Sequence, residues 1–163
     1  MSLDVHICPV CGLNMCLTHF DKWWDENKFD WDHGSWQLPM FYSSKFKIWW
    51  NPDKFNWRSS HRLAQYCARY IKIWWNPNKF EWRNASYSLA KYCCRFFDIW
   101  WDEEKFNWKY SWALAEHCSP HFRKWWNPDK YDNREISIEA LILFCAKYEA
   151  DWKYFVLYNT LTL

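Results

Sequence analysis

The chain has 163 residues, half of them hydrophobic, and its 21 basic and 19 acidic side chains leave a net charge of only +2. So balanced a charge excludes binding to nucleic acid or to an acidic membrane by bulk attraction alone. With 17 Trp, two Gly, three Val and three Thr, the composition lacks the turn glycines and β-branched residues of a sandwich or barrel, and predicts an all-α fold.

The first motif in chain order is Cys8-Pro9-Val10-Cys11-Gly12, which is followed by Cys16 and His19. The phrase Cys-Pro-x-Cys-Gly resembles the zinc knuckle of zinc ribbons and treble clefs, where a tight turn directs two thiolates at one ion. The resemblance implies zinc. Cys16 and His19 would complete the ligand set, because residues three apart at a helix start can reach an ion on one face. A closed set of three Cys and one His is structural, since no coordination position is left for water.

A phrase led by two tryptophans recurs five times at intervals of 25 or 26 residues. The pairs begin at Trp23, Trp49, Trp74, Trp100 and Trp125. In the second copy the pair is followed by Asn51 and Pro52. Asn before Pro is typical of a helix start, because the Asn side chain caps free amides and Pro has no amide to lose. We therefore predict a short helix from Pro52 to Trp57 and at each equivalent place.

A longer second helix is predicted after a break that carries Ser or Asn as the new cap. The expected caps are Ser59, Ser60, Asn84, Ser86, Ser111 and Ser137. Its apolar stripe begins with Leu63, Cys67 and Tyr70, whose steps of four and three place them on one face. The Cys of this stripe recurs as Cys93, Cys118 and Cys145. We expect reduced, buried thiols here, because equivalent residues in repeats stacked about 10 Å apart lie beyond bonding distance.

The N-terminal segment also has a second interpretation. Cys16 and His19 stand seven and four residues before Trp23, the spacing that separates the Cys and His of the fourth unit from the next Trp pair. They could therefore form the last helix of a truncated leading repeat, with His6 as a third zinc ligand or with no metal at all. The two interpretations are compatible, since the helix of a half-repeat can lend its Cys and His to an ion.

A unit of this size cannot bury its aromatic face alone, so neighbours must stack and share one core. The expected array resembles an α-solenoid in kind, without the signature of a particular family. Residues 1–22 are predicted to form a zinc-knuckle cap, residues 23–151 five two-helix repeats, and residues 152–163 a C-terminal cap or an apolar strip that awaits a partner.

Basic residues recur in pairs four positions apart, and equivalent positions of stacked repeats line up in rows. The pairs are Lys54 and Arg58, Lys79 and Arg83, Lys105 and Lys109, and Lys130 and Arg134. We expect these rows to contact a protein partner, with Trp, Tyr and Arg as anchors. The alternative is single-stranded nucleic acid, whose phosphates would follow the basic rows while bases stack on Trp. Acidic residues beside each Lys favour the protein.

We expect a non-catalytic binding or inhibitory module. The sequence has no Ser-His-Asp order, phosphate loop or paired-acid motif, and the i, i+4 pair His117 and His121 lacks a third metal ligand. No apolar run approaches the ~18 residues of a membrane span, and the start lacks the charged leader of a signal peptide. The expected compartment is the cytoplasm, without membrane association.

Overall fold

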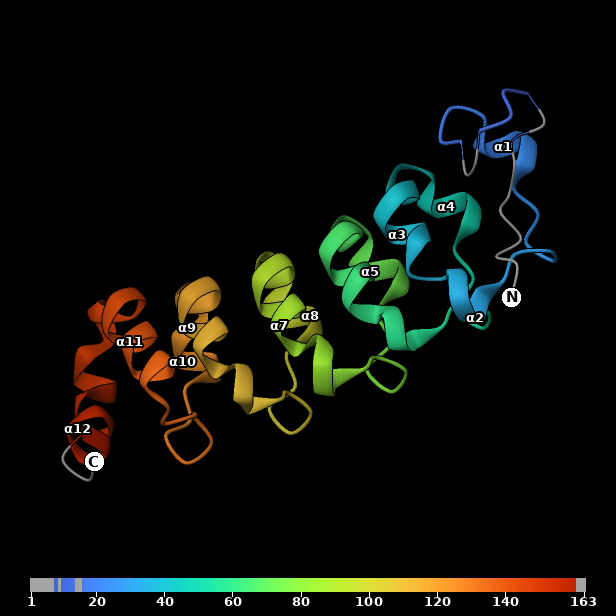
Figure 1. The fold of residues 1–163 in the computed structure, drawn as a ribbon. Coiled ribbons are helices and arrows are strands. Elements are labelled where there is room, and N and C mark those ends of the chain that lie inside the picture. The colour runs from blue at the N-terminus through green and yellow to red at the C-terminus, as the bar shows by residue number, and fades with distance from the viewer. Residues whose placement is uncertain (1–7, 9, 14–15, 161–163) are drawn as a thin grey trace.

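The repeating unit is a long helix followed, after a sharp bend, by a short helix (Figure 1). The computed structural model describes residues 8, 10–13 and 16–160, and every regular element in them is a helix, which confirms the predicted all-α array. The long arms are α2 (Trp31–Gly34) with α3 (Gln37–Tyr42), η2 (Trp57–Ser59) with α5 (Ser60–Tyr66), α7 (Trp82–Cys93), η5 (Trp108–Tyr110) with α9 (Ser111–Cys118), and α11 (Glu135–Phe144).

The short arms start just after the bend and end on the first Trp of a pair. They are α1 (Phe20–Trp23), η1 (Ser43–Lys45) with α4 (Phe46–Trp49), η3 (Ala68–Tyr70) with α6 (Ile71–Trp74), η4 (Cys94–Phe96) with α8 (Phe97–Trp100), and η6 (Ser119–His121) with α10 (Phe122–Trp125). The last copy, η7 (Ala146–Tyr148) with α12 (Glu149–Thr160), has a longer final helix.

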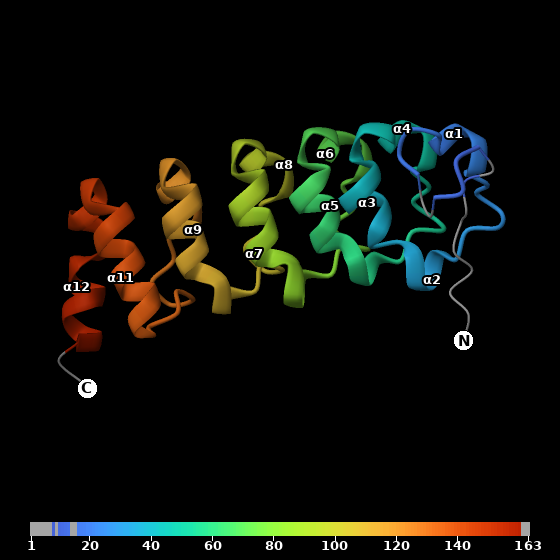
Figure 2. The ribbon, with the colours of Figure 1, turned by 45° about the horizontal axis from the view of Figure 1, so that its top comes forward.

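The units stand side by side in an elongated array, and each long arm packs on the long arm of the next unit (Figure 2). The connecting turns, Asn51–Asn56 and its equivalents, follow one edge of the array, here called the turn edge. The bends, Cys67–Tyr70 and equivalents, follow the opposite edge, here called the bend edge. None of the described helices has the length and apolar character needed to cross a bilayer.

A buried hydrogen bond explains the seven-residue spacing between Cys and Trp. The backbone leaves the helix at Cys67 (φ −118°, ψ 22°), and the indole Nε1 of Trp74 donates to the Cys67 carbonyl over 2.8 Å. The bond closes the bend and satisfies both a buried ring N–H and a carbonyl at a helix end. It recurs from Trp23 to Cys16, Trp49 to Tyr42, Trp100 to Cys93, Trp125 to Cys118 and Trp152 to Cys145.

The predicted helix from Pro52 to Trp57 is wrong: these residues form a single turn that leads into the next helix. Asn51 does cap it, since its Oδ1 accepts from the amides of Asp53 (3.0 Å) and Lys54 (3.3 Å). The chain then becomes extended at Asn56 (φ −74°, ψ 100°), which lets the rings of Phe55 and Trp57 both pack on Trp50. The turn therefore positions these rings for packing. The prediction failed because Asn before Pro caps a turn in the same way as it caps the start of a helix.

The predicted serine caps are also wrong, because the cap is the last residue of each turn. Asn56, Glu81 and Asn107 accept an amide two or three residues ahead. Ser60, Ser86 and Ser111 are instead fully buried and join neighbouring repeats, as when Ser86 Oγ accepts from the Asn107 amide over 3.0 Å. The same bond links Ser35 to Asn56, Ser60 to Glu81 and Ser111 to Asp132. Ser59 is half-buried, and Ser137 is fully buried without a hydrogen-bond partner for its Oγ.

The core runs the length of the array and contains the first Trp of each pair and the recurring Cys. Trp74, Cys67 and Leu63 are at most 1% exposed, and their equivalents are buried in the same way. The C-terminal segment packs against this core. Phe155 in α12 lies edge-on against Trp126, with the ring centroids 5.6 Å apart. In an earlier copy of the phrase the third Trp, Trp57, lies edge-on against Trp50 in the same way.

Candidate functional site

The N-terminal motif forms a tight turn around the sulfur of Cys8. The Gly12 amide donates to the Cys8 carbonyl and the Cys8 amide to the Leu13 carbonyl, both over 2.9 Å. Gly12 has φ +68°, a left-handed conformation that glycine adopts without strain. The Val10 amide donates to Cys8 Sγ over 3.4 Å, so that a backbone N–H contacts the sulfur.

Cys16 and His19 bring the second pair of ligands to this turn. The ligand atoms of Cys8, Cys11, Cys16 and His19 all lie within 4.8 Å of one another, and Cys16 Sγ is 3.5 Å from His19 Nδ1. The four predicted ligands are therefore together in space. Cys8 and Cys16 are buried, while Cys11 faces solvent.

Hydrogen bonds favour the thiolate form of Cys16. The backbone amide of His19 contributes most, followed by the Cys11 and His19 side chains, and together they lower the Cys16 pKa to about 7 against the opposing effect of burial. Three Cys and one His at this separation form a closed set of soft and borderline ligands, the type that holds Zn²⁺ tetrahedrally. His6, the alternative third ligand, lies outside the described residues.

Cys16 has both of the roles that its sequence position allowed. Its carbonyl accepts the Trp23 indole N–H over 2.9 Å, as the recurring Cys does in later repeats, while its thiol lies in the ligand cluster. The half-repeat and metal-site interpretations thus describe the same segment. By contrast, His121 stacks on Phe97 at 4.6 Å, and the N-terminal cluster is the only such group of His, Cys, Asp and Glu among the residues that the structure describes.

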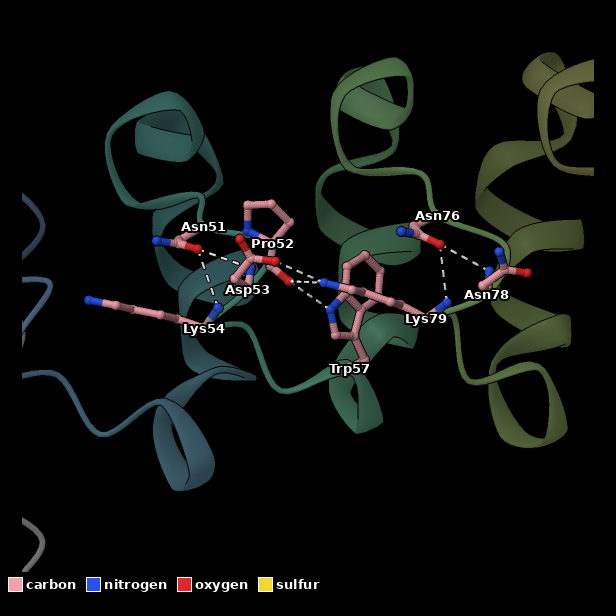
Figure 3. Close-up of polar contacts among 8 residues, drawn as sticks. All are labelled: Asn51, Pro52, Asp53, Lys54, Trp57, Asn76, Asn78 and Lys79. Carbon is pink, nitrogen blue, oxygen red and sulfur yellow. Dashed lines mark hydrogen bonds and ion pairs between the residues drawn. The ribbon is translucent and has the colours of Figure 1, made fainter.

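The first members of the predicted basic pairs tie each turn to the turn before it (Figure 3). Lys79 Nζ lies 3.1 Å from the Pro52 carbonyl, 3.0 Å from Asp53 Oδ1, and over the Trp57 ring at 6.0 Å. The other lysines make equivalent contacts: Lys54 with Glu26 and Asn27, Lys105 with Asn78, and Lys130 with Glu103 and Glu104. Each of these ammonium groups therefore stabilises a junction between repeats.

The second members are more exposed. Arg58, Arg83 and Lys109 face solvent beside the turn edge. Arg134 pairs with Asp132 and donates to the Lys109 carbonyl over 2.6 Å. Arg58 also borders a surface hollow of about 660 Å³ between α2 and the turn that leads into η2, whose other lining residues include Asp32, Asp53 and Trp57. Acidic and basic groups thus alternate along this edge.

A row of aromatic residues on the long arms was not predicted from the sequence. Each residue just before the recurring Cys is aromatic and is half-buried or exposed. This aromatic row comprises Tyr66, Tyr92, His117 and Phe144. Tyr87 extends it, with its ring 6.4 Å from His117 and its hydroxyl 2.8 Å from Lys91 Nζ. The sequence did contain a signal, since the residue before each of these four Cys is Tyr, Tyr, His or Phe.

No protein family, curated protein or solved structure matches this chain.

Proposed function

We propose that the chain is a non-catalytic binding or inhibitory module, an α-solenoid that holds a protein partner and is closed at its N-terminus by a structural zinc ion. The observation that supports a protein partner is the aromatic row, because Tyr, Trp and Arg dominate the energetic centres of protein interfaces. The aromatic row lies on the long arms, which the stacked core holds in place.

Zinc suits the four ligands because Zn²⁺ imposes no geometry of its own beyond the tetrahedron that three thiolates and an imidazole fill. The ion would link the Cys8–Gly12 turn to the segment that leads into α1. Since Cys16 also accepts the Trp23 indole, the same ion would support the first buried Trp of the array.

The contacts of the lysines with carboxylates favour a protein partner over nucleic acid. Single-strand binders combine a positive groove with free aromatic faces. Here the Nζ atoms of Lys54, Lys79 and Lys130 lie within 3.2 Å of a carboxylate in the preceding turn, which neutralises the row locally. The exposed Arg58, Arg83 and Lys109 remain as anchors for a partner of either kind.

The experiment compares two variants in affinity purification with and without nuclease. Tyr66→Ala with Tyr92→Ala removes two rings of the aromatic row, and Lys54→Ala with Lys79→Ala removes two cations. We expect a protein that survives nuclease treatment, is lost from the tyrosine variant, and is retained by the lysine variant. Tight binding of oligothymidylate that falls steeply with salt, and by similar steps for each lysine, would contradict the proposal and favour nucleic acid.

A further inference from the structure

Three successive junctions use two small residues of a long arm, four positions apart, to receive the next repeat. The first is a Ser whose Oγ accepts a backbone amide of the next turn, and the second is an Ala whose carbonyl accepts the Sγ–H of the next recurring Cys. The pairs are Ser60 with Ala64, Ser86 with Ala90, and Ser111 with Ala115. All of these residues are 0% exposed, because the next long arm covers them.

The last long arm has isoleucine at both of these positions. In α11 the Ser is replaced by Ile138 and the Ala by Ile142. Ile142 is 47% exposed, since α11 is the last long arm that the structure describes. A branched side chain here fills the space that a closely packed neighbour would need, and Ile138 offers no side-chain acceptor for a backbone amide. A neighbour that stacks as inside the array, such as the leading end of a second copy, therefore does not fit on α11.

The outer face of α11 is also more apolar than the equivalent face of the inner arms. Leu143 is 71% exposed, whereas the inner arms have Gln65, Lys91 or Glu116 at its position. Ile136, seven residues before Leu143 and thus on the same side of the helix, is 48% exposed. The end units of repeat arrays need a polar outer face to stay soluble. An apolar outer face is instead typical of a surface that another molecule covers.

We propose that this terminal face, formed by Ile136, Ile142 and Leu143, joins two copies of the chain in a twofold-symmetric dimer, with Leu143 beside the axis. The terminal face continues the stacking interface of the array, where the same side of each inner arm is covered by another helix (Figure 2). A helix is therefore the element that fits on it, and α11 of a second copy supplies one.

Self-complementarity distinguishes the terminal face from the inner junctions. An inner junction joins two different faces, because the Ser and Ala of one arm need the amide and the Cys of the next. The terminal face has only aliphatic side chains at these places, and such side chains interdigitate with an identical set. A contact of α11 with α11 leaves no side-chain acceptor of this kind without its donor.

The dimer joins two arrays at their C-terminal ends and leaves the Cys-rich N-terminal ends far apart. Phe144, the last member of the aromatic row, adjoins the terminal face, so that one particle contains two aromatic rows. A partner with two copies of the recognised motif would gain avidity from this arrangement. Dimerisation itself does not depend on what the aromatic row binds.

Sedimentation equilibrium of the purified chain, from low to high micromolar concentration, tests the proposal. We expect the mass to rise from one chain to two and no further. Leu143→Lys and Leu143→Glu give α11 the residues that α7 and α9 have at this position, Lys91 and Glu116, so the helix tolerates both. Each variant places a charge in the contact and should raise the dimer Kd by on the order of tenfold or more. An equimolar mixture of the two should recover the dimer, because the axis sets position 143 of one copy against that of the other.

Ile73→Lys is the matched control. Ile73 is 54% exposed on a short arm, and the equivalent residue of a later repeat is Lys124, so this variant makes a similar change away from the terminal face. It should dimerise as the wild type does, and circular dichroism should show all the variants to be equally helical. A wild type that stays monomeric would overturn the proposal, as would a dimer that Leu143→Lys leaves intact or that Ile73→Lys weakens equally. A mixture of the two charged variants that stays monomeric would exclude the twofold contact, and a mass that grows beyond two chains would indicate head-to-tail stacking instead.

Discussion

The serine hydroxyls that join neighbouring repeats provide a sharp test of how the array is held together. Ser86 Oγ accepts the Asn107 amide over 3.0 Å and donates to the Trp82 carbonyl over 2.6 Å, both across part-buried contacts. Ser137 is just as buried, but its Oγ has no hydrogen-bond partner. Ser86→Ala and Ser137→Ala therefore make the same chemical change with and without an inter-repeat bond.

In Ser86→Ala the Asn107 amide loses its acceptor, which costs about 1–3 kcal/mol for a part-buried donor. The higher helix propensity of alanine offsets roughly 0.5 kcal/mol of this cost. The net loss should be ~1–2 kcal/mol, or about 2–8 °C in Tm for a chain of this size. Ser137→Ala loses no bond, so it should be neutral or slightly stabilising.

Urea unfolding of both variants, followed by circular dichroism and Trp fluorescence, measures the difference. A repeat array can unfold in more than one step, so the midpoint of each probe is compared with that of wild type. Equal destabilisation by the two substitutions would refute the reasoning, because it would show that the cost comes from repacking and not from the bond between repeats.

Three further predictions concern the metal site, the buried thiols and the independence of the repeats. Purified protein should carry about one zinc per chain, lost in Cys8→Ser and Cys11→Ser and kept in Cys67→Ser; elemental analysis that finds none in freshly purified wild type would exclude zinc. Burial raises the pKa of Cys67 and Cys93 from the ordinary 9.0 to about 12, so their contribution to stability is complete below pH 9 and is lost as pH rises toward 12. Urea titrations across that range should show a decline that Cys93→Ala makes shallower, and an unchanged slope would contradict it. Deletion of residues 74–99, one whole unit, should leave a shorter folded array with helical circular dichroism, because each repeat contacts mainly its neighbours; outright unfolding would indicate a single global core.

The composition and the spacing of Trp and Cys were sufficient to predict an all-α repeat with buried Cys, and the N-terminal motif was sufficient to predict that four ligands lie together. Spacing succeeds for the repeat because a residue that recurs in every unit must have the same environment in every unit. The helix limits were harder. Asn51 before Pro52 caps a turn as well as it caps a helix, and only the packing of Phe55 and Trp57 on Trp50 decides that the chain straightens at Asn56.

The roles of the polar residues also depended on tertiary structure. A serine near a helix start is a plausible cap on local grounds, yet Ser86 faces the next repeat, whose position the sequence of one unit does not reveal. Lys79 similarly looked like a surface cation, because the carbonyl and carboxylate that it contacts belong to the unit before it.

Neighbouring repeats make different kinds of contact on the two edges of the array. On the bend edge, Phe46 stacks on Tyr70 and Phe122 on Tyr148 at 4.5 Å. On the turn edge, neighbours are connected by lysine chains such as Lys79, whose partner Asp53 is largely in solvent. Mobile counterions screen such exposed pairs and leave stacked rings unaffected. We therefore expect the contacts on the bend edge to stay fixed while those on the turn edge weaken as salt is added. The curvature of the array, and so the shape of the surface that it offers a partner, should then depend on ionic strength.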